Sequence, residues 1–420
     1  MGEHRASQPA AALSGKRLLI LGGGLWQLEY VRRARQLGLE TWVTDWSPAA
    51  LARDVADHFE PIDLKDREGT LALAARARVD GVLTAADIGV PTAAFVANAL
   101  GLPGHSVELA ELATNKFKMR ERCRAAGIPC PWYRLVESAE DARAAATPER
   151  LPVIVKPIDN CSSRGVRWVD RADELTPAVD AALDASLARR ALVEQFLVGV
   201  EGSIEAIVQD GCAIVLGICD KTKSPLPDRY DLELRYPGAH APRAQADLDA
   251  LAQRLATAFG IRDAILHIEF LVAHDTGTVY LIEFAVRGCG SKVVTHLMPA
   301  MTGVDVPAVV IRQALGVRSR VEPVRGCHGA LHFLMFPPGR VTAVHGVSEA
   351  KALPGVIDAC VEASPGDRID AVHDGRSRPG HVLVCGRDRA EVQQRIADVR
   401  RGIRLEYDDG ARVAPLDMPA

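Results

Sequence analysis

Short apolar runs alternate with stretches of helical periodicity in the N-terminal quarter of the chain, and this alternation constrains the fold more than any other sequence feature. Strands that alternate with helices form βαβ units, and such units build a parallel sheet with helices on its faces. The N-terminal part is therefore predicted to be a βαβ lobe. Its predicted strands lie at 17–21, 40–44 and 79–84, and its predicted helices end at Leu37 and Leu100.

The turn after the first predicted strand carries a partial dinucleotide-binding fingerprint. Gly22 and Gly24 open a helix, and Asp45 follows about 20 residues later, as in the Gly-x-Gly-x-x-Gly motif that binds NAD. Gln27 stands where that motif has its third glycine. The match is incomplete, so an NAD-dependent protein or a non-catalytic nucleotide-binding protein is kept open as an alternative.

Length and charge limit the classes of protein to which the chain can belong. With roughly 150 residues per domain, 420 residues predict about three domains or one three-part assembly. Lys and Arg number 50 and Asp and Glu 54, and this near-neutral balance argues against nucleic acid or an anionic membrane as a partner. Apolar runs such as Leu18–Leu21 are far shorter than the ~20 residues that cross a bilayer.

Neither the N-terminal segment nor the cysteines point to secretion. Residues 1–15 lack the apolar stretch of a signal peptide and are predicted to be a frayed tail. The 9 cysteines are scattered without a Cys-x-x-Cys pair, which favours reduced thiols over a disulfide framework or a zinc site. The sequence therefore predicts a cytoplasmic protein.

Further along, the chain changes from alternating elements to β-rich segments. Asn115 and Lys116 open an amphipathic helix that ends at Gly127-Ile128-Pro129, with Gly in the usual C-terminal position and Pro beyond it. A surface helix is predicted between Pro131 and Pro152. Strands are predicted at 151–157, 167–169, 192–196, 203–209 and 213–219, then a helix at 244–259 and a hairpin of 264–272 with 278–284. Short strands at 329–333 and 381–384 and a helix at 389–400 predict an α+β lobe in the C-terminal part.

Two glutamates on the predicted hairpin carry the strongest chemical signal. The hairpin turns at His274-Asp275-Thr276-Gly277, and counting outward from its centre brings Glu269 and Glu283 opposite each other to within one residue. Like charges in that position destabilise a ladder unless a cation neutralises them, and Mg²⁺ is typically bound by one or two carboxylates plus substrate phosphates. The alternative is a structural pair, with one glutamate turned outward and the other in a salt bridge.

A second signal combines a lysine at a strand end with a loop of small residues. Lys156 ends a predicted strand, and Ser162, Ser163 and Gly165 follow with hydroxyls and backbone N–H groups that suit a polyphosphate. Arg287 precedes a glycine-rich stretch where a phosphate or carboxylate can approach the backbone. The phosphate loop of P-loop proteins and the His-Arg-Asp and Asp-Phe-Gly motifs of protein kinases are absent from the sequence.

The order of these motifs resembles that of the ATP-grasp superfamily. The matching segments lie within residues 16–320 and are, in order, Thr114–Lys116, Gly127–Pro129, Val155–Pro157, Ser162–Val166, Glu194–Leu197, Glu201, His267–Glu269 and Glu283–Arg287. Residues 329–407, with Ser364-Pro365-Gly366-Asp367 among them, look like the extra C-terminal lobe of the L-amino-acid ligase branch and its carboxylase-like relatives.

The resemblance implies a mixed α/β and α+β protein with the ATP-grasp fold. Its parts would be a disordered tail (1–15), a Rossmann-like pre-ATP-grasp lobe (16–112), a linker helix with the lid lobe (113–198), a C-terminal ATP-grasp lobe with the metal site (199–320) and an appended α+β lobe (321–420). ATP would bind between the lid lobe and the C-terminal ATP-grasp lobe. The glycines at 22–24 would then close the first βα turn, or border the acceptor site.

Roles for individual residues come from the same resemblance. ATP would be held by residues of the linker, lid and neighbouring strand: Lys116 and Lys156 at the phosphates, Ser162, Ser163, Gly165 and Val166 in a mobile loop over them, Glu194, Phe196 and Leu197 at the adenine, and Glu201 at the ribose. Glu269 and Glu283 would hold Mg²⁺, with Mn²⁺ as the alternative ion. Arg287 would stabilise the transferring phosphoryl group or the tetrahedral intermediate. Lys221 is a candidate for holding a substrate carboxylate or phosphate, and the alternative is a solvated loop residue.

One position departs from the family pattern. Many ATP-grasp ligases have Glu-x-Asn at the last metal position, with the Asn as a further ligand, whereas Ala285 stands two residues after Glu283 here. The resemblance then implies that a second metal is held differently, or that another group such as His267 from the facing strand helps. A histidine beside an acidic metal site can equally be a structural hydrogen-bonding residue.

The resemblance implies an ADP-forming carboxylate–amine ligase. A small carboxylate, in the first instance an amino acid, would attack the γ-phosphate of ATP to give an acyl phosphate, and an amine would displace phosphate. Alternatives within the superfamily are a bicarbonate-activating carboxylase and a purine-biosynthesis ligase; the sequence contains no Met-Lys-Met biotin-attachment site. The expected partners are small molecules, and a homodimer is left open.

Overall fold

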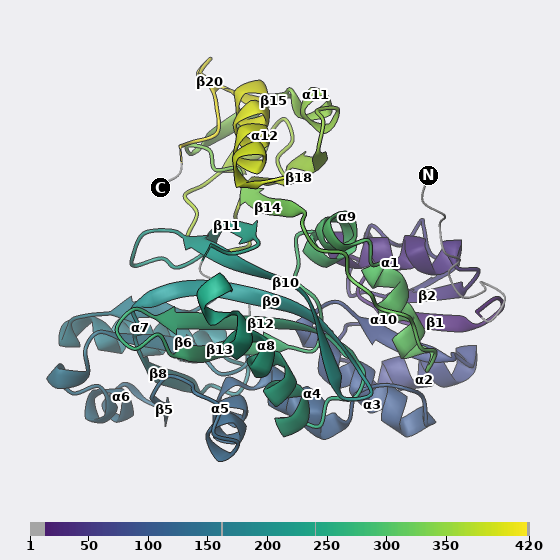
Figure 1. Ribbon diagram of the computed structural model, residues 1–420, viewed down its shortest axis with the longest axis horizontal. Coiled ribbons are helices and arrows are strands. Elements are labelled where there is room, and N and C mark those ends of the chain that lie inside the picture. Colours follow the sequence, from purple (N-terminus) through teal and green to yellow (C-terminus); the bar gives the residue numbers. More distant parts are fainter. Residues whose placement is uncertain (1–12, 161–162, 240, 418–420) are drawn as a thin grey trace.

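The N-terminal lobe is a parallel sheet of four strands in the order β3-β2-β1-β4. The computed structural model describes residues 13–160, 163–239 and 241–417 (Figure 1). In β1 (Arg17–Leu21) the four aliphatic side chains are fully buried, because helices cover both faces of the sheet. The other elements are α1 (Leu25–Gln36), β2 (Glu40–Thr44), β3 (His58–Glu60), α2 (Arg67–Ala77), β4 (Gly81–Thr84) and α3 (Val90–Leu100). The predicted βαβ lobe is confirmed, whereas β3 and α2 were not predicted.

Two linker helices, α4 (Val107–Thr114) and α5 (Lys116–Ala125), lead into the lid lobe. The Asn115 side chain caps α5 by accepting a hydrogen bond from the Lys118 N–H at 3.1 Å, so this helix begins where the sequence predicts. The lid is an antiparallel sheet in the order β5-β8-β6-β7, with α6 and α7 packed on it. Its elements are β5 (Tyr133–Val136), α6 (Ala139–Ala145), β6 (Val153–Pro157), β7 (Arg167–Val169), α7 (Leu175–Ala185) and β8 (Ala191–Gln195).

An eight-stranded sheet forms the centre of the molecule, in the order β13-β12-β9-β10-β11-β14-β18-β16. Its first five strands come from the middle of the chain: β9 (Gly199–Gln209), β10 (Cys212–Lys223), β11 (Asp231–Tyr236), β12 (Ala264–Ala273) and β13 (Val279–Ala285). The predicted hairpin of β12 and β13 is confirmed. Helix α8 (Ala241–Ala258) packs on β9 and β10, and its buried leucines enter the same apolar core.

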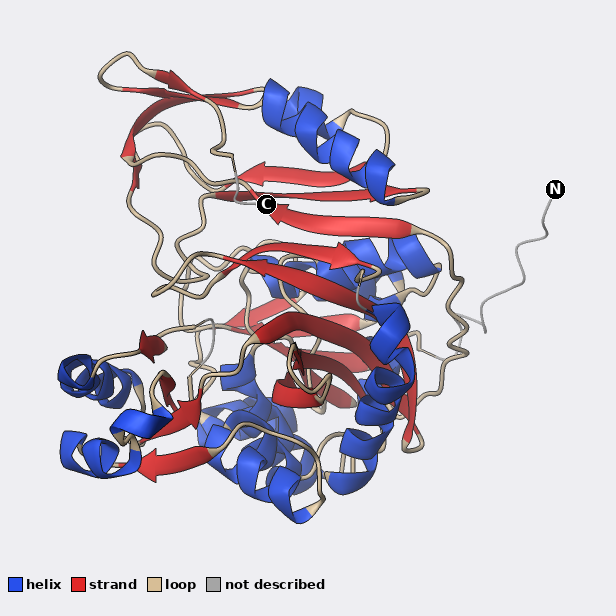
Figure 2. Cartoon of the chain, turned by 60° about the vertical axis from the view of Figure 1, so that its left-hand side comes forward, coloured by secondary structure: helices blue, strands red, loops and turns tan. Residues whose placement is uncertain are grey.

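The remaining three strands of this sheet belong to the C-terminal part, which therefore continues the central sheet (Figure 2). They are β14 (His328–Phe333), β16 (Val356–Val361) and β18 (Gly380–Gly386). A small second sheet and two helices cover them: β15 (Gly339–His345), α11 (Val347–Lys351), β17 (Arg368–Ile369), α12 (Arg389–Gly402), β19 (Arg404–Tyr407) and β20 (Arg412–Val413).

Between β13 and β14 the chain returns to the N-terminal lobe. A π-helical turn (Val293–Leu297) leads through α9 (Met298–Thr302) to α10 (Val306–Ala314), and α10 packs against α1 and β4 in the apolar core of the N-terminal lobe. No single described helix has the length and apolar character needed to cross a membrane. The helical segments Val293–Thr302 and Val306–Ala314 meet these criteria only when they are taken together, and they are bent by 119° relative to each other. The mixed α/β and α+β fold predicted from the sequence is confirmed.

Candidate functional site

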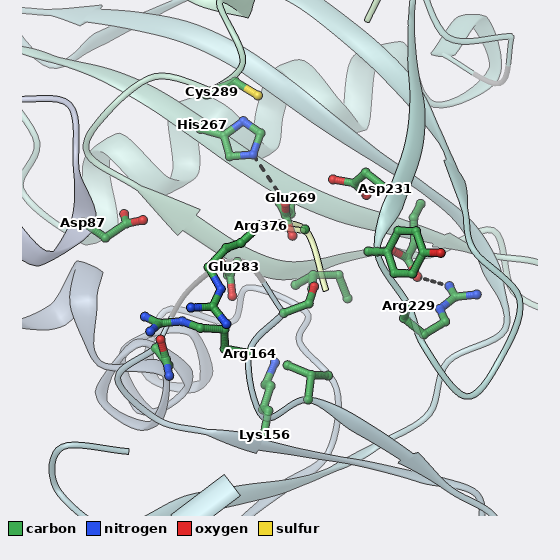
Figure 3. Close-up of a pocket in the computed structure, with 18 of the residues that line it drawn as sticks. Asp87, Lys156, Arg164, Arg229, Asp231, His267, Glu269, Glu283, Cys289 and Arg376 are labelled. Carbon is green, nitrogen blue, oxygen red and sulfur yellow. Dashed lines mark hydrogen bonds and ion pairs between the residues drawn. The ribbon is translucent and has the colours of Figure 1, made fainter. Parts of the chain in front are cut away.

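A cleft of about 620 Å³ opens where the N-terminal lobe, the lid lobe and the central sheet meet (Figure 3). The C-terminal part also reaches it. The predicted site residues that line the cleft are Lys116, Lys156, Ser163, Val166, Glu194, Phe196, Leu197, Glu201, His267, Glu269, Glu283 and Arg287. The fold thus gathers side chains from distant parts of the sequence around one cavity.

Glu269 and Glu283 lie opposite each other on β12 and β13, as the turn predicts. The register of the ladder shifts directly after Glu269. Counting outward from the turn could therefore locate the facing pair only to within one residue. A lysine from another element neutralises each carboxylate. Lys221 Nζ lies 2.5 Å from Glu269 Oε1, and Lys116 Nζ lies 3.1 Å from Glu283 Oε2. The facing pair is confirmed, and two cations already offset its charge.

Electrostatics keep Glu269 ionised. Burial alone would raise the pKa of this carboxyl, but the charge of Lys221 and a hydrogen bond from His267 hold the pKa well below its usual range. Burial also disfavours the Lys221 ammonium, yet Asp231 and Glu269 raise its pKa well above the ordinary value. The oxygen ligands of Glu269 and Glu283 suit a hard divalent cation, which would take the place of the lysine charges.

His267 lies on the same face of β12 as Glu269, two residues before it. On neighbouring strands it faces Ala285 of β13 and Glu205 of β9. Its Nδ1 is 2.6 Å from Glu205 Oε1, and its Nε2 is 3.4 Å from Glu269 Oε1. Burial opposes protonation, but the two carboxylates raise the pKa of the ring to about 9. The imidazole of the folded protein is therefore protonated at neutral pH.

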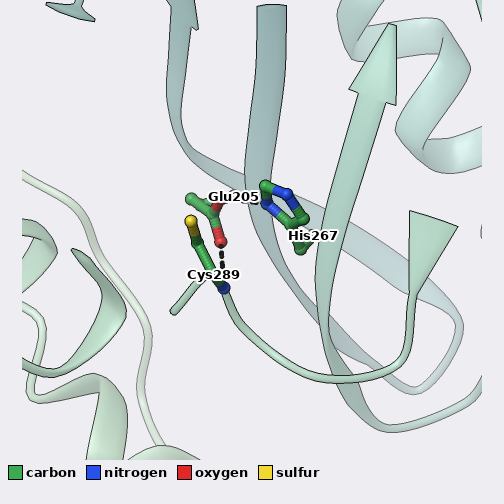
Figure 4. Close-up of side chains that lie close together, drawn as sticks. All are labelled: Glu205, His267 and Cys289. Carbon is green, nitrogen blue, oxygen red and sulfur yellow. Dashed lines mark hydrogen bonds and ion pairs between the residues drawn. The ribbon is translucent and has the colours of Figure 1, made fainter. Parts of the chain in front are cut away.

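Glu205, His267 and Cys289 form a cluster whose potential metal-binding atoms lie within 4.8 Å of one another (Figure 4). Both oxygens of Glu205 already have partners, because Oε1 binds His267 and Oε2 accepts a hydrogen bond from the Cys289 N–H at 3.1 Å. Burial and the nearby charge of Glu205 raise the pKa of the Cys289 thiol well above its ordinary value. The cluster therefore orients His267, and its sulfur remains a thiol.

A buried triad joins the lid to the linker helix. Lys156 Nζ lies 2.6 Å from Glu194 Oε2, and Arg120 Nε lies 2.8 Å from Glu194 Oε1. Arg120 also donates to the backbone oxygen of Ile282 on β13, at 2.5 Å. Burial lowers the pKa of Lys156, while the two cations outweigh the effect of burial on Glu194 and lower its pKa. Lys156 and Glu194 thus line the cleft from a fixed position.

Glu201 of β9 lies in a network of ion pairs beside an aromatic ring. It pairs with Lys223 of β10 at 3.1 Å and with Arg229. Lys223 also pairs with Asp231 of β11 at 2.8 Å. The guanidinium of Arg229 lies 5.9 Å from the ring centroid of Phe196. This end of the cleft therefore combines an apolar surface with fixed charges.

Arg287 joins the central sheet to the N-terminal lobe. Its Nε lies 2.9 Å from Asp87 Oδ1 and its Nη2 2.6 Å from Asp87 Oδ2, which makes a two-contact ion pair. Burial would raise the pKa of Asp87, but the charge of Arg287 lowers it. Asp87 follows the end of β4, so the pair closes one side of the cleft.

Only part of the predicted mobile loop lies among the described residues, because Ser162 falls outside them. Ser163 and Val166 line the cleft, and Ser163 has a left-handed backbone with φ of 59°. Gly165 packs against the lid instead. Its φ is 70°, and a Cβ at this position would lie 2.8 Å from the Ala185 side chain of α7. Glycine is required there for packing and backbone conformation.

Two residues singled out by the sequence have structural partners. The Lys221 side chain is only 2% exposed and lies between Asp231 and Glu269, so it does not line the cleft. Asp45 accepts a hydrogen bond from the Gly23 N–H at 2.8 Å. The partial NAD fingerprint would have given this carboxylate to a ribose, but in the structure it holds the first βα turn.

Four charged residues in or beside the cleft were not predicted from the sequence: Asp87, Asp231 and Arg378 line it, and Glu205 lies beside it against His267. In β11, charged and apolar residues alternate over Asp231–Tyr236, which is the pattern of a half-buried strand and could have identified Asp231. Asp87 follows a buried parallel strand, where polar residues commonly line a ligand crevice. Glu205 and Arg378 have no comparable local signal, because their surroundings arise only from tertiary packing.

Three family models match the chain in order. Residues 31–104 match the ATP-grasp N-terminal domain, 149–296 the ATP-grasp domain, and 332–408 the L-amino acid ligase C-terminal domain 2. A protein of Sinorhizobium fredii (strain NBRC 101917 / NGR234), described as "Uncharacterized protein y4rH", is 26% identical over 407 residues, which cover 93% of this chain and 84% of that protein.

Solved structures share the whole architecture. The L-amino acid ligase from Bacillus licheniformis superposes with a TM-score of 0.79 at 22% identity, covering 94% of this chain and 99% of that one. The biotin carboxylase domain of the Hydrogenobacter thermophilus 2-oxoglutarate carboxylase, solved with MgADP and bicarbonate, gives 0.72 at 18% identity and covers 93% and 90%. These likenesses show a common fold. The three family matches identify the chain as a member of the ATP-grasp superfamily that carries the C-terminal domain type of L-amino acid ligases.

Proposed function

We propose that the protein is an ADP-forming ligase that activates a small carboxylate, such as that of an amino acid, and couples it to an amine. The observation that carries this proposal is the pair of facing glutamates, Glu269 and Glu283, in a cleft that also receives Lys116 and Lys156. Two carboxylates for a metal ion and separate cations for a polyphosphate suit ATP-dependent phosphoryl transfer. Membership in the ATP-grasp superfamily supports the same chemistry.

The donor set fits Mg²⁺ or Mn²⁺, which Glu269 and Glu283 would hold. When bound, the ion supplies positive charge at the phosphate oxygens where negative charge develops. Lys221 and Lys116 now offset the glutamate charges, at 2.5 Å and 3.1 Å respectively. Binding of the ion would free Lys116 for the phosphates, and its contact with the backbone oxygen of Asn160, at 2.6 Å, places it beside the lid loop.

The remaining predicted residues would position the nucleotide and the reacting groups. Lys156, fixed by Glu194, would contact the phosphates, and the loop from Ser163 to Val166 would exclude water above them. Phe196 offers an apolar surface to the adenine, and Glu201 would bind the ribose. Arg287, held by Asp87, would stabilise the phosphoryl group during attack by the carboxylate.

His267 would complete the metal site in place of the missing asparagine, once the ion displaces the proton from its Nε2. It lies directly across the ladder from Ala285, its Nε2 faces Glu269, and Glu205 holds its Nδ1. A carboxylate on the far nitrogen is the usual arrangement for a metal-binding histidine. Nitrogen coupling in the electron paramagnetic resonance spectrum of Mn²⁺ bound with ADP is expected in the wild type and not in H267N. The same coupling in both proteins would remove His267 from the coordination sphere.

A phosphate-release screen tests the reaction. The full chain would be incubated with ATP, Mg²⁺ and panels of amino acids, amines, nucleotide precursors and bicarbonate. We expect ADP and phosphate in equal amounts, and only when a carboxylate and an amine are both present. ADP release with bicarbonate alone would indicate a carboxylase, and no ADP release together with tightly bound NAD would contradict the proposal.

Replacement of Glu283 by Gln should lower ADP formation by at least about 100-fold, because the site loses a charged metal ligand. The variant should melt close to the wild-type temperature, because it relieves the like-charge pair but also removes the ion pair with Lys116, and these two effects oppose each other. E349Q on the exposed face of α11 is the matched control and should keep full activity. Unimpaired turnover in E283Q would exclude Glu283 from the site.

A further inference from the structure

The loop that follows β13 has a left-handed backbone where it meets the next helical turn. It spans residues 286–292 and lines the cleft with Arg287, Cys289, Gly290 and Ser291. Ser291 and Lys292 have φ of 49° and 61°, and among the described residues they are the only two adjacent non-glycine residues with positive φ. A Cβ makes this conformation unfavourable, and it persists only where neighbouring groups hold it. The contacts of Lys292 must therefore offset this cost.

Asp358 of the C-terminal part holds Lys292. Lys292 Nζ lies 2.5 Å from Asp358 Oδ2, and the two side chains are only 17% and 9% exposed. Two more basic side chains surround this carboxylate: Lys351 of α11 at 3.1 Å and His381 of β18 at 3.8 Å. Burial would raise the pKa of Asp358, but His381 and the two lysines hold it well below its usual range. An ionised carboxylate on β16 thus fixes the end of the loop.

The rest of the loop is bound to residues of the candidate site. The Cys289 N–H donates to Glu205 Oε2 at 3.1 Å (Figure 4). Arg287 Nη1 donates to the backbone oxygen of Gly288 at 2.9 Å, so this arginine is held by the loop as well as by Asp87. A displacement of the loop would therefore move the guanidinium of Arg287 within the cleft.

We propose that Asp358 is a positioning residue for the cleft. By holding Lys292 in the left-handed conformation, it keeps the loop in the arrangement that presents Arg287 to the phosphoryl group. The role of Arg287 rests on the proposed ligase function; the restraint of the loop by Asp358 does not. Asp358 does not itself line the cleft, so the C-terminal part acts on the site through this loop.

A purely structural role for Asp358 leads to a different expectation. If Asp358 served only the fold of the C-terminal part, through Lys351 and His381, the residue type at position 292 would not alter the effect of its replacement. Glycine adopts positive φ without a steric cost. If Asp358 acts through Lys292, a glycine at that position keeps the loop in place without the ion pair, whereas an alanine does not.

Thiol labelling tests the restraint without turnover. Cys289 lies on the loop and is partly exposed, so its rate of alkylation by iodoacetamide, followed by mass spectrometry of the full chain after digestion, reports the loop. D358N and K292A should each raise this rate by about 10-fold, while K292G and D358N/K292G should stay near the wild type. K351A is the matched control, because Lys351 pairs with the same carboxylate from outside the loop, and it should also stay near the wild type. The fully buried Cys219 should remain unlabelled in every folded variant, which checks the fold.

Turnover tests the positioning role once the phosphate-release screen has found substrates. D358N should lower kcat by about 10-fold with the KM for ATP unchanged, and D358N/K292G should recover it. An unchanged labelling rate in D358N would overturn the inference. An equal rise in D358N and D358N/K292G would also overturn it and assign Asp358 to the fold alone, as would faster labelling with undiminished kcat. The expected labelling pattern without ADP release in any protein would contradict the ligase and leave the restraint of the loop standing.

Discussion

At the scale of single residues, His267 has a charge that depends strongly on folding. Its pKa is raised from 6.5 to about 9 in the folded protein, because Glu205 and Glu269 face the ring. The protonated His267 ring therefore stabilises the folded protein fully below about pH 6.5, and this stabilisation is lost as the pH rises through about 9. We expect the metal-free wild type to lose on the order of 3 kcal/mol of unfolding free energy over this range, relative to H267N.

Urea denaturation in the presence of a chelator, at about pH 6 and about pH 9.5, measures this difference. H332N is the matched control, since His332 also pairs with a buried carboxylate, Glu233, at 2.8 Å but lies outside the metal site. The control should keep the pH dependence of the wild type. Parallel pH profiles for the wild type and H267N would contradict the charge assigned to His267.

Some residue contacts could be predicted from the sequence and others could not. The pairing of Glu269 with Glu283 follows from one short turn, because the register of an antiparallel hairpin is set locally. The partners of His267 and Arg287 come from other strands and lobes: Glu205 lies 62 positions from His267, and Asp87 lies 200 positions from Arg287. No local pattern records such contacts. The family resemblance implied the positions of both residues, and for Arg287 the glycine-rich stretch after it also indicated a nearby phosphate or carboxylate.

At the scale of elements, Glu194 holds the lid sheet to helix α5 and to β13. Replacement of Glu194 by Leu would leave Arg120 and Lys156 buried without their shared carboxylate. We expect this variant to lose about 3–5 kcal/mol of unfolding free energy in chemical denaturation. In contrast, E111L removes an exposed pair between Glu111 of α4 and Lys118 of α5 and should cost at most about 1 kcal/mol. Similar losses of unfolding free energy in the two variants would show that the buried triad stabilises the protein no more than an exposed ion pair does.

The elements themselves were predicted unevenly. Strands and helices with a strong period, such as β1, α5 and the β12–β13 hairpin, begin and end close to the predicted residues. The strand β11 was missed, because its charged side chains made the segment resemble a loop. Those charges are retained in the strand because Lys221 and Lys223 of β10 neutralise Asp231. Tertiary ion pairs therefore overrode the local polarity of this segment.

At the scale of the whole molecule, the C-terminal part and the middle of the chain share one core. Leu383 of β18 is fully buried in the same apolar cluster as Leu216 of β10. L383A should cost about 2–5 kcal/mol and lower the melting of both parts together in calorimetry. L175A, in the apolar core of the lid, is the control, and it should lower the melting transition of the lid. A separate transition for the C-terminal part, shifted alone by L383A, would contradict the shared core.

The joining of the two parts was beyond what the sequence could predict. An appended α+β lobe was expected after residue 320, and the pairing of Tyr236 with Gly329 makes its first strand a continuation of the central sheet. Pairing between strands so far apart in the chain depends on the packing of both faces of the sheet, and a single sequence does not contain that information. The continuity brings Arg378 into the cleft.

In the proposed reaction, a carboxylate attacks the γ-phosphate of ATP in the cleft between Lys156 and the two glutamates. The direct test uses a substrate found in the phosphate-release screen, labelled with ¹⁸O in its carboxylate. The carboxylate oxygen that attacks phosphorus remains on the phosphate when the amine displaces it. Mass spectrometry should therefore find one ¹⁸O in each released phosphate, together with ADP and the coupled product. Product formation with unlabelled phosphate would exclude attack of the substrate carboxylate on the γ-phosphate.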